Sequence, residues 1–266
     1  MSDYPTHWRR PPQILKHPVW RPIIQIGIVA YLILALSTLE VDWLRVWDGL
    51  DRGWRFVEGF LTPDFTSRWR DISEGLVESL TMTVTSTVVG IALSIPFGVG
   101  AAGNIAPAPV YFVCRAVIAV SRSLQEVIIA IFFVAMFGFG PFAGFVTLAF
   151  ATIGFLAKLL AEAIEEIDMA QVEAVRASGG SWLQVVNYAV EPQVTPRLIG
   201  LSLYRLDINF RESAVIGIVG AGGIGATLNT AIDRYEHDSA GAILLIIIAI
   251  VMLAEYLSGH VRKWVQ

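Results

Sequence analysis

Residues 162–192 read EAIEEIDMAQVEAVRASGGSWLQVVNYAVEP and form the longest polar interruption in the otherwise apolar second half of the chain. Asp168 is followed three residues later by Gln171, a capping-box spacing that predicts a helix start. Ser181 and Gln184 repeat this spacing thirteen residues further on. The stretch therefore predicts two short helices in succession.

The two predicted helices meet at Gly179-Gly180. Glycine just past a helix end can close the last turn in the left-handed conformation, and Pro192 is expected to stop the second helix. Apolar runs long enough to cross a bilayer flank the segment, which we call the elbow. We expect the elbow to lie on one membrane face, where another protein can push or pull on it. A solvated loop is the alternative, which the caps, glycines and proline disfavour.

The composition is that of an integral membrane protein. Hydrophobic residues make up 55% of the chain and charged residues 16%, with a mean hydropathy of +0.62, whereas roughly a quarter of a soluble domain is charged. The net charge of −4 argues against binding to nucleic acid. Cys114 is the single cysteine, which excludes a disulfide framework within one chain. No lysine precedes Ser or Thr, so the chain has no phosphate-binding loop for ATP.

Six membrane spans are predicted, at residues 22–39, 80–99, 110–137, 145–163, 194–215 and 241–257. Lys and Arg are in excess before the first span and acidic residues follow it, which places the amino terminus in the cytoplasm. Six spans then bring the elbow and both termini to the cytoplasm.

The predicted organisation has four parts. Residues 1–21 form a cytoplasmic basic tail, and residues 22–74 contain the first span and a tryptophan-rich segment at the outer membrane interface. Residues 75–258 form the main transmembrane domain, and residues 259–266 a second cytoplasmic tail. Hydroxyl side chains within the 80–99 span are expected to face protein instead of lipid.

Several charged or amide side chains lie inside the predicted spans, where facing lipid would be costly. They are Arg122, Glu126, Arg205, Asp207, Asn209, Arg211 and Glu212. Helical spacing pairs Arg122 with Glu126 and Asp207 with Arg211, and it places Arg205, Asn209 and Glu212 on another face. Counting along the helices puts Arg122 and Arg205 near the middle of the bilayer. These residues either neutralise one another and staple the helices together, or line a translocation pathway for a charged solute.

Residues 217–225 read GIVGAGGIG and contain the pattern G-x-G-x-x-G. A dinucleotide site would need a preceding strand and a later acidic residue, and neither is present here. We interpret the run as a tight re-entrant turn between closely packed helices, or less readily as a contact of backbone amides with substrate. The candidate outer gate consists of Gly217, Gly220, Gly222, Gly223 and Gly225.

At the elbow the sequence resembles the permease subunits of ATP-binding-cassette (ABC) importers. Their signature is E-A-A, three residues, Gly, nine residues, and I-x-L-P. The positions that match at the same spacing are Glu173, Ala174, Gly179 and Pro192. The positions that depart from it are Val175, Ala189 and Glu191.

Further blocks in the same order resemble the phosphonate-family permeases specifically. They run from Arg122 through GFGPFAG (138–144), and include IGFLAKLLAEAIEEID (153–168) and LYRLDINFRESAVIGIVGAGGIG (203–225). The resemblance covers roughly residues 75–258. It implies an all-α integral membrane protein with the type I ABC importer permease fold and a coupling elbow.

The resemblance also implies partners and a substrate class. Two copies of the permease would form a homodimer in the bacterial inner membrane, and two ATPase subunits would dock on the elbows and hold the ATP and magnesium. This chain would bind no cofactor itself. A binding protein would deliver phosphonate or a related phosphorus oxyanion at the outer face. Phosphite, hypophosphite and phosphate are alternatives, and methionine is a more distant one.

The residues implied in coupling to the ATPase belong to the elbow. They are Glu162, Glu165, Glu166, Asp168, Glu173, Ala174, Arg176, Gly179, Gly180 and Ser181. Two other classes of protein are disfavoured. A passive channel would not need the elbow, and a membrane enzyme would need a catalytic constellation, whereas the four histidines are terminal or in predicted loops without metal-ligand spacing.

Overall fold

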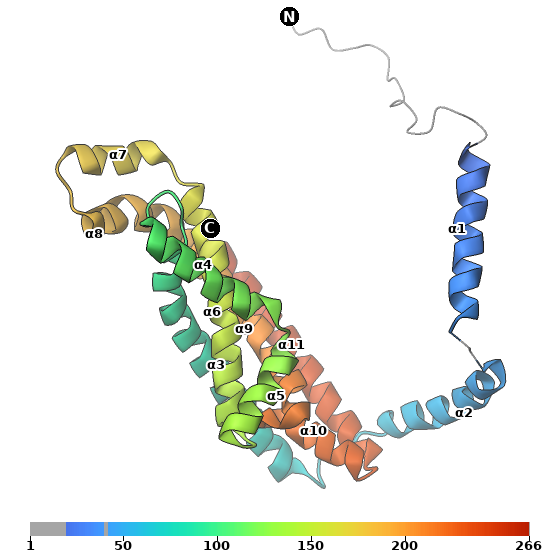
Figure 1. Cartoon of the computed structure of the whole chain (residues 1–266). Helices are drawn as coiled ribbons and strands as arrows, with labels where there is room; N and C mark the ends of the chain where they lie inside the picture. The colour runs from blue at the N-terminus through green and yellow to red at the C-terminus, as the bar shows by residue number, and fades with distance from the viewer. Residues whose placement is uncertain (1–19, 40–41, 266) are drawn as a thin grey trace, which may run out of the picture. The chain divides into compact units, whose positions relative to one another are not determined.

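The computed structural model describes residues 20–39 and 42–265 (Figure 1). The predicted basic tail therefore lies almost entirely outside the described residues. The chain divides into two compact units, Met1–Phe56 and Val57–Gln266. Within the described ranges every assigned element is helical, which confirms the all-α prediction.

The first unit contains α1, Trp20–Ser37, and most of α2, Trp43–Phe60. α1 is a run of large aliphatic residues and corresponds to the first predicted span. α2 begins after Asp42, whose carboxylate accepts hydrogen bonds from the amides of Leu44 and Arg45 at 3.1 Å. It mixes charges with exposed tryptophans and is not among the helices apolar enough to cross a membrane, as predicted.

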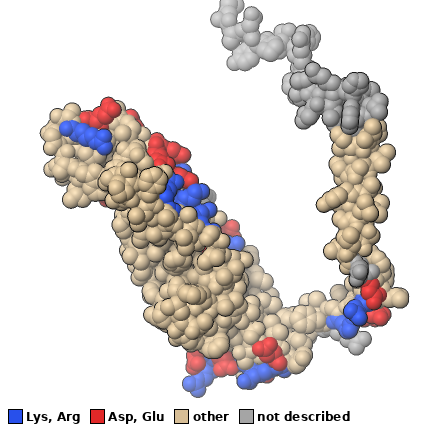
Figure 2. Space-filling model, viewed as in Figure 1, with Lys and Arg blue, Asp and Glu red and all other residues tan. Residues whose placement is uncertain are grey.

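The second unit is built around α3 (Trp69–Gly100), α6 (Pro141–Glu165), α9 (Glu191–Ile216) and α11 (His237–Val265). α6 packs against both α3 and α9, and α11 covers α9 (Figure 1). On the face drawn in Figure 2, the charged side chains of this unit lie at its two ends and along one edge, and the broad surface between them is uncharged. An uncharged middle is expected of a bundle that crosses an apolar layer.

Three of the five hydroxyl side chains between residues 81 and 87 of α3 face the neighbouring helices, as predicted, whereas Thr81 and Thr85 are exposed. Thr83, Ser86 and Thr87 are buried. Ser86 and Thr87 donate hydrogen bonds to the carbonyl oxygen of Thr83 at 3.0 and 2.7 Å. A hydroxyl satisfied within its own helix can be buried against another helix at little cost.

The predicted span at 110–137 is wrong as one continuous helix. α4, Ala108–Ser123, and α5, Glu126–Phe137, are bent by 96° at Leu124 and Gln125, whose ψ angles of 139° and 145° are extended. Residues 121–126 read SRSLQE, so the bend falls on a short polar interruption that the prediction of one continuous span passed over. Arg122 and Glu126 consequently lie in different helices, and their spacing in the sequence does not place them on one helical face.

The GFGPFAG motif separates α5 from α6, as predicted. Gly138 and Gly140 have φ angles of 88° and 133°, and Pro141 opens α6. α6 thus begins four residues before the predicted start at 145. Proline suits this position because the first turn of a helix leaves its amides without partners in any case.

The elbow consists of α7, Met169–Ala177, and α8, Trp182–Val185. A π-helical turn, Val186–Val190, joins α8 to α9. Pro192 does not end the second elbow helix as predicted, because it lies in the first turn of α9, where its missing N–H is harmless.

A second π-helical turn, Gly217–Ala221, ends α9, and α10, Gly223–Asp233, follows at an angle of 56°. The sequence pattern did not predict α10 as a separate helix. In the described ranges, α3, α6 and α11 are each long and apolar enough to cross a membrane. The number rises to five if each bent pair counts as one span, and the stretch Pro22–Ser37 of α1 is a shorter apolar helix. Six spans therefore remain a prediction, which requires that α1 crosses the membrane and that each bent pair forms one span.

Candidate functional site

The first elbow helix begins at Asp168, as predicted, but its capping partner differs. The Asp168 carboxylate accepts a hydrogen bond from the Ala170 amide at 3.0 Å. The Asp168 amide donates to the side-chain oxygen of Gln193 at 2.9 Å, so the predicted pairing with Gln171 is wrong. Gln193 comes from α9 and ties the start of the elbow to that helix.

The second elbow helix and the hinge follow the prediction. The Ser181 amide donates to the side-chain oxygen of Gln184 at 2.7 Å within a capping box. Gly179 has a φ angle of +83°, and the Gly180 amide donates to the carbonyl oxygen of Val175 at 3.0 Å. The glycine pair is a closed, hydrogen-bonded turn.

Apolar residues fix the elbow to the end of the bundle. A buried cluster joins its underside to the ends of α3, α6 and α9, and includes Ile105, Leu160, Ile164, Val172, Val185, Ala189 and Val190. Ala189, which departs from the importer signature, is 1% exposed. A small apolar side chain thus fills that signature position in this chain.

Three of the predicted coupling carboxylates pair within the chain. Glu162 lies 3.2 Å from Lys158, and Glu166 lies 2.6 Å from Arg197. Glu165 accepts hydrogen bonds from Arg115 at 2.7 Å and from the Gly103 amide at 2.8 Å. Glu165 and Glu166 thus attach the end of α6 to α4 and α9, whereas Glu162 pairs within α6. Their role in coupling to an ATPase stays a prediction.

The turn between α3 and α4 is also attached to the elbow region. The indole N–H of Trp182 donates to the carbonyl oxygen of Ile105 at 3.0 Å. The Asn104 amide group donates to the carbonyl oxygen of Ile164 at 2.7 Å. The elbow is therefore held on one side by this turn and on the other by α9.

The outward surface of the elbow combines free charges with apolar side chains. Glu173, Ala174 and Arg176 are exposed, and in the described part of the chain neither charged residue has an ion-pair partner. Leu183 and Tyr188 are 65% and 72% exposed. This mixture of exposed aromatic, aliphatic and charged groups is suited to binding a protein.

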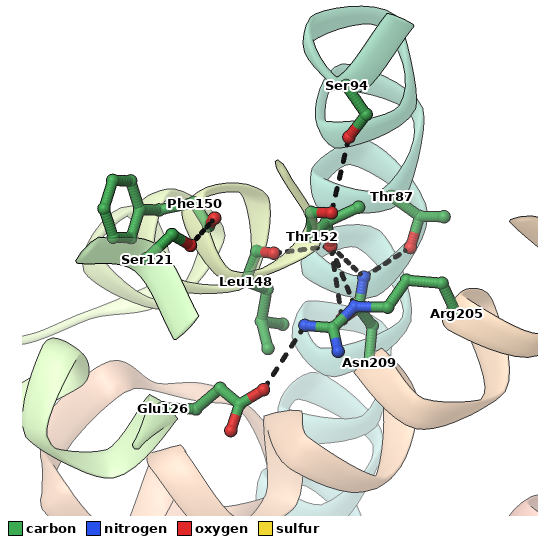
Figure 3. Close-up of polar contacts among 9 residues, drawn as sticks. All are labelled: Thr87, Ser94, Ser121, Glu126, Leu148, Phe150, Thr152, Arg205 and Asn209. Atoms are coloured by element: carbon green, nitrogen blue, oxygen red, sulfur yellow. Dashed lines mark hydrogen bonds and ion pairs between the residues drawn. The ribbon is translucent and has the colours of Figure 1, made fainter. Parts of the chain in front are cut away.

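A buried polar cluster occupies the middle of the bundle (Figure 3). The Arg205 guanidinium donates to the Thr152 hydroxyl at 3.1 Å and lies 3.5 Å from the Glu126 carboxylate. The Asn209 amide group donates to the hydroxyls of Thr87 at 2.8 Å and Thr152 at 3.0 Å. Side chains from α3, α5, α6 and α9 thus meet at one point.

The intramembrane charges pair differently from the helical-spacing prediction in one case. Asp207 and Arg211 are 3.1 Å apart, which confirms their predicted pairing. The pairing of Arg122 with Glu126 is wrong, because Glu126 pairs with Arg205. Glu212 is half-buried and Arg122 is exposed. Whether any of these residues contacts a solute remains a prediction.

The glycine-rich run is a tight turn between packed helices, as predicted, and its gating role stays a prediction. The Gly140 amide donates to the carbonyl oxygen of Gly220 at 3.0 Å, which joins the two glycine motifs. The Gly223 amide donates to Glu78 at 3.1 Å, and the Ile224 amide to Ser79 at 2.9 Å. α3 therefore caps the start of α10.

Sequence reasoning missed most of the residues that hold these sites together. They are Glu78, Ser79, Asn104, Arg115, Thr152, Trp182, Gln193 and Arg197. Arg115 could have been found from the sequence, since it is a charged residue inside the predicted span at 110–137 and is expected to have a partner. In the ranges that the structure describes, no three His, Cys, Asp or Glu residues are placed to hold a metal ion.

The sequence matches known transport proteins. The family described as "Binding-protein-dependent transport system inner membrane component" matches residues 94–266. The phosphate-import permease protein PhnE of Mycolicibacterium smegmatis is 47% identical over 89% of this chain. The chain spans 44% of that relative's length. The phosphite transport system permease protein PtxC of Stutzerimonas stutzeri is 38% identical over 92% of this chain and 90% of its own length.

Solved structures share the arrangement of the helices. A chain of the inward-facing MetNI methionine ABC transporter aligns with a TM-score of 0.65 and 24% identity, over 73% of this chain and 96% of its own length. A chain of an amino acid ABC transporter aligns with a TM-score of 0.62 and 18% identity, over 76% of this chain and 99% of its own length. At these identities the likeness concerns the fold.

Proposed function

Since the chain belongs to the family of binding-protein-dependent transport system inner membrane components, we propose that it forms the pathway for ATP-driven import of a phosphorus oxyanion. Its fold is that of the type I ABC importer permeases. The observation that carries the substrate class is the 38% identity to a phosphite permease over 90% of that protein's length. A phosphate-import permease is also similar, whereas the methionine permeases are only 27–28% identical.

Phosphate, phosphite and phosphonate share a tetrahedral phosphorus atom with anionic oxygens. A pathway for any of them must offset the hydration that the anion loses in a narrow pore. Guanidinium groups suit this task because they donate paired hydrogen bonds to such oxygens. We propose that the solute is one of these three ions and that a binding protein delivers it at the outer face.

The energy for import comes from separate ATPase subunits that dock on the elbow. The exposed Glu173, Arg176, Leu183 and Tyr188 supply the docking surface. The ion pairs and hydrogen bonds beneath this surface support the proposal, because a firmly attached elbow passes a push to α3, α6 and α9 instead of bending.

Two copies of the chain, each with one elbow, would engage two ATPase subunits. A related permease in place of the second copy is the other arrangement that the family allows. In both arrangements the elbow and the two termini face the cytoplasm of the bacterial cell.

Reporter fusions test this orientation. A topology reporter after Trp54 should read as external and one after Arg176 as cytoplasmic. The reverse reading at either position would mean that the predicted number of spans before it is wrong.

The ATPase dock is tested by Glu173→Lys in the reconstituted complex. We expect normal membrane insertion, loss of ATPase pull-down, and loss of phosphate, phosphite and methylphosphonate uptake into vesicles. Glu58→Lys is the matched control, because Glu58 is also exposed but lies in α2. Normal pull-down together with normal uptake in Glu173→Lys would remove the elbow from the coupling mechanism.

A further inference from the structure

The three arginines predicted to line the translocation pathway, Arg122, Arg205 and Arg211, differ in which groups neutralise their charge. Arg205 is 3% exposed and is held by Glu126, the Thr152 hydroxyl and the ring of Phe155, whose centroid lies 5.3 Å from the guanidinium carbon. A solute cannot reach such a group without taking the bundle apart.

Arg211 and Arg122 are the accessible arginines of this set. The side chain of Arg211 is 58% exposed, but its guanidinium already has the Asp207 carboxylate 3.1 Å away. Arg122 is exposed, and among the residues that the structure describes it has no ion pair or hydrogen bond. Of the three, only Arg122 therefore offers an uncompensated positive charge.

The main chain at Arg122 is nevertheless fixed. Ser121, its neighbour, donates a hydrogen bond to the carbonyl oxygen of Phe150 on α6 at 2.9 Å (Figure 3). Gly154 lets α6 approach closely, because a methyl group there would overlap the Ser121 side chain and lie 3.3 Å from Cγ of Arg122. The stem of Arg122 is packed against α6 while its charged end is open.

The position in the fold adds a second argument. Arg122 lies in the last turn of α4, directly before the 96° bend, and α4 and α5 together are long and apolar enough to form a span. A lone guanidinium in such a span is costly against hydrocarbon, so it must meet water or an anion. A fixed stem with an open guanidinium is suited to paired hydrogen bonds with oxygens on phosphorus.

Resting on the proposed function, we propose that Arg122 is the residue that senses the charge of the phosphorus oxyanion during passage. Arg205 is then structural. Phosphate oxygens also occur on lipid headgroups, which share this chemistry, so the experiment must separate the two sources.

The experiment uses the permease with its ATPase and binding protein in vesicles of a galactolipid, whose headgroup has no phosphate, alone or mixed with phosphatidylglycerol. Uptake of inorganic phosphate, phosphite and methylphosphonate is measured for wild type, Arg122→Gln and Arg122→Lys. Arg70→Gln is the control, since Arg70 is an exposed arginine paired with Glu74 at 2.8 Å near the start of α3.

We expect Arg122→Gln to slow uptake about ten-fold or more in both vesicles, as the loss of a hydrogen bond to a charged group implies. Protein yield and ATPase pull-down should stay normal, and Arg122→Lys should retain part of the uptake. Arg205→Gln should lower protein yield instead.

Each contrary result has a separate meaning. If the wild type takes up none of the three ions, the proposed function is wrong and this inference falls with it. Normal uptake by Arg122→Gln beside an active wild type overturns the inference alone. A defect confined to vesicles with phosphatidylglycerol means that Arg122 binds a lipid headgroup, which overturns its assignment to the solute.

Discussion

The two glycine-rich turns of the second unit use glycine for different reasons. In the elbow, Gly179 has a φ angle of +83°, yet a methyl group there would meet no atom within 4 Å. In the 217–225 turn, a methyl group on Gly225 would overlap the carbonyl oxygen of Ala214, and one on Gly222 would lie 2.7 Å from the Pro141 nitrogen. Gly179 is therefore needed for its backbone conformation alone, although a methyl group on the neighbouring Gly180 would lie 2.8 Å from the carbonyl oxygen of Val175. The 217–225 turn needs glycine for packing at Gly217 and Gly225, and for both packing and a positive φ angle at Gly220, Gly222 and Gly223.

This difference has consequences for how each turn can act. The 217–225 turn is built into contacts with α3, α6 and α9, so a change there should disturb the whole bundle. The elbow turn is exposed and closed by its own amides, so a change there should stay local. A partner protein can therefore bind at the elbow turn without disturbing the packing of the bundle.

The largest expected effect in this comparison is that of Gly225→Ala. Overlap with main-chain atoms cannot be relieved by a rotamer change, so we expect destabilisation by about 3 kcal/mol or more. The measurement is the thermal unfolding midpoint in detergent. Gly200→Ala in α9 is the control, because no atom lies within 4 Å of a methyl group there. That control should stabilise the helix slightly, and equal midpoints for the two variants would contradict the packing argument.

A smaller effect is expected for Gly179→Ala. Holding alanine in the left-handed conformation costs about 1–2 kcal/mol, and no contact is lost. Gly179→Asn should cost less, because asparagine tolerates this conformation. A bulky residue at Gly179 should abolish transport, because the hinge shapes the surface on which the ATPase docks. The protein should still insert into the membrane. If Gly179→Ala destabilised the protein as much as Gly225→Ala, the two turns would not differ as the geometry indicates.

Short-range sequence patterns were a good guide to the elbow and a poor one to its attachments. The cap at Ser181 with Gln184 and the hinge at Gly179 depend on residues within a few positions of each other. The partner of Asp168 is Gln193, which lies 25 residues away and could not be chosen from spacing. The anchoring of Glu165 to Arg115, 50 residues apart, is of the same kind.

The sequence by itself determined the membrane character, the two-helix elbow with its glycine hinge, and the Asp207–Arg211 pair, because apolar runs and helical periodicity are properties of consecutive residues. Only the tertiary structure decided the sharp bend between α4 and α5, since the polar run SRSLQE at residues 121–126 marks an interruption but does not fix its angle. That bend frees Glu126 from the helical register of Arg122 and brings it to Arg205, 79 residues further along the chain. Which arginine is neutralised and which stays open thus depends on how α5 packs against α9, and no local pattern contains that information.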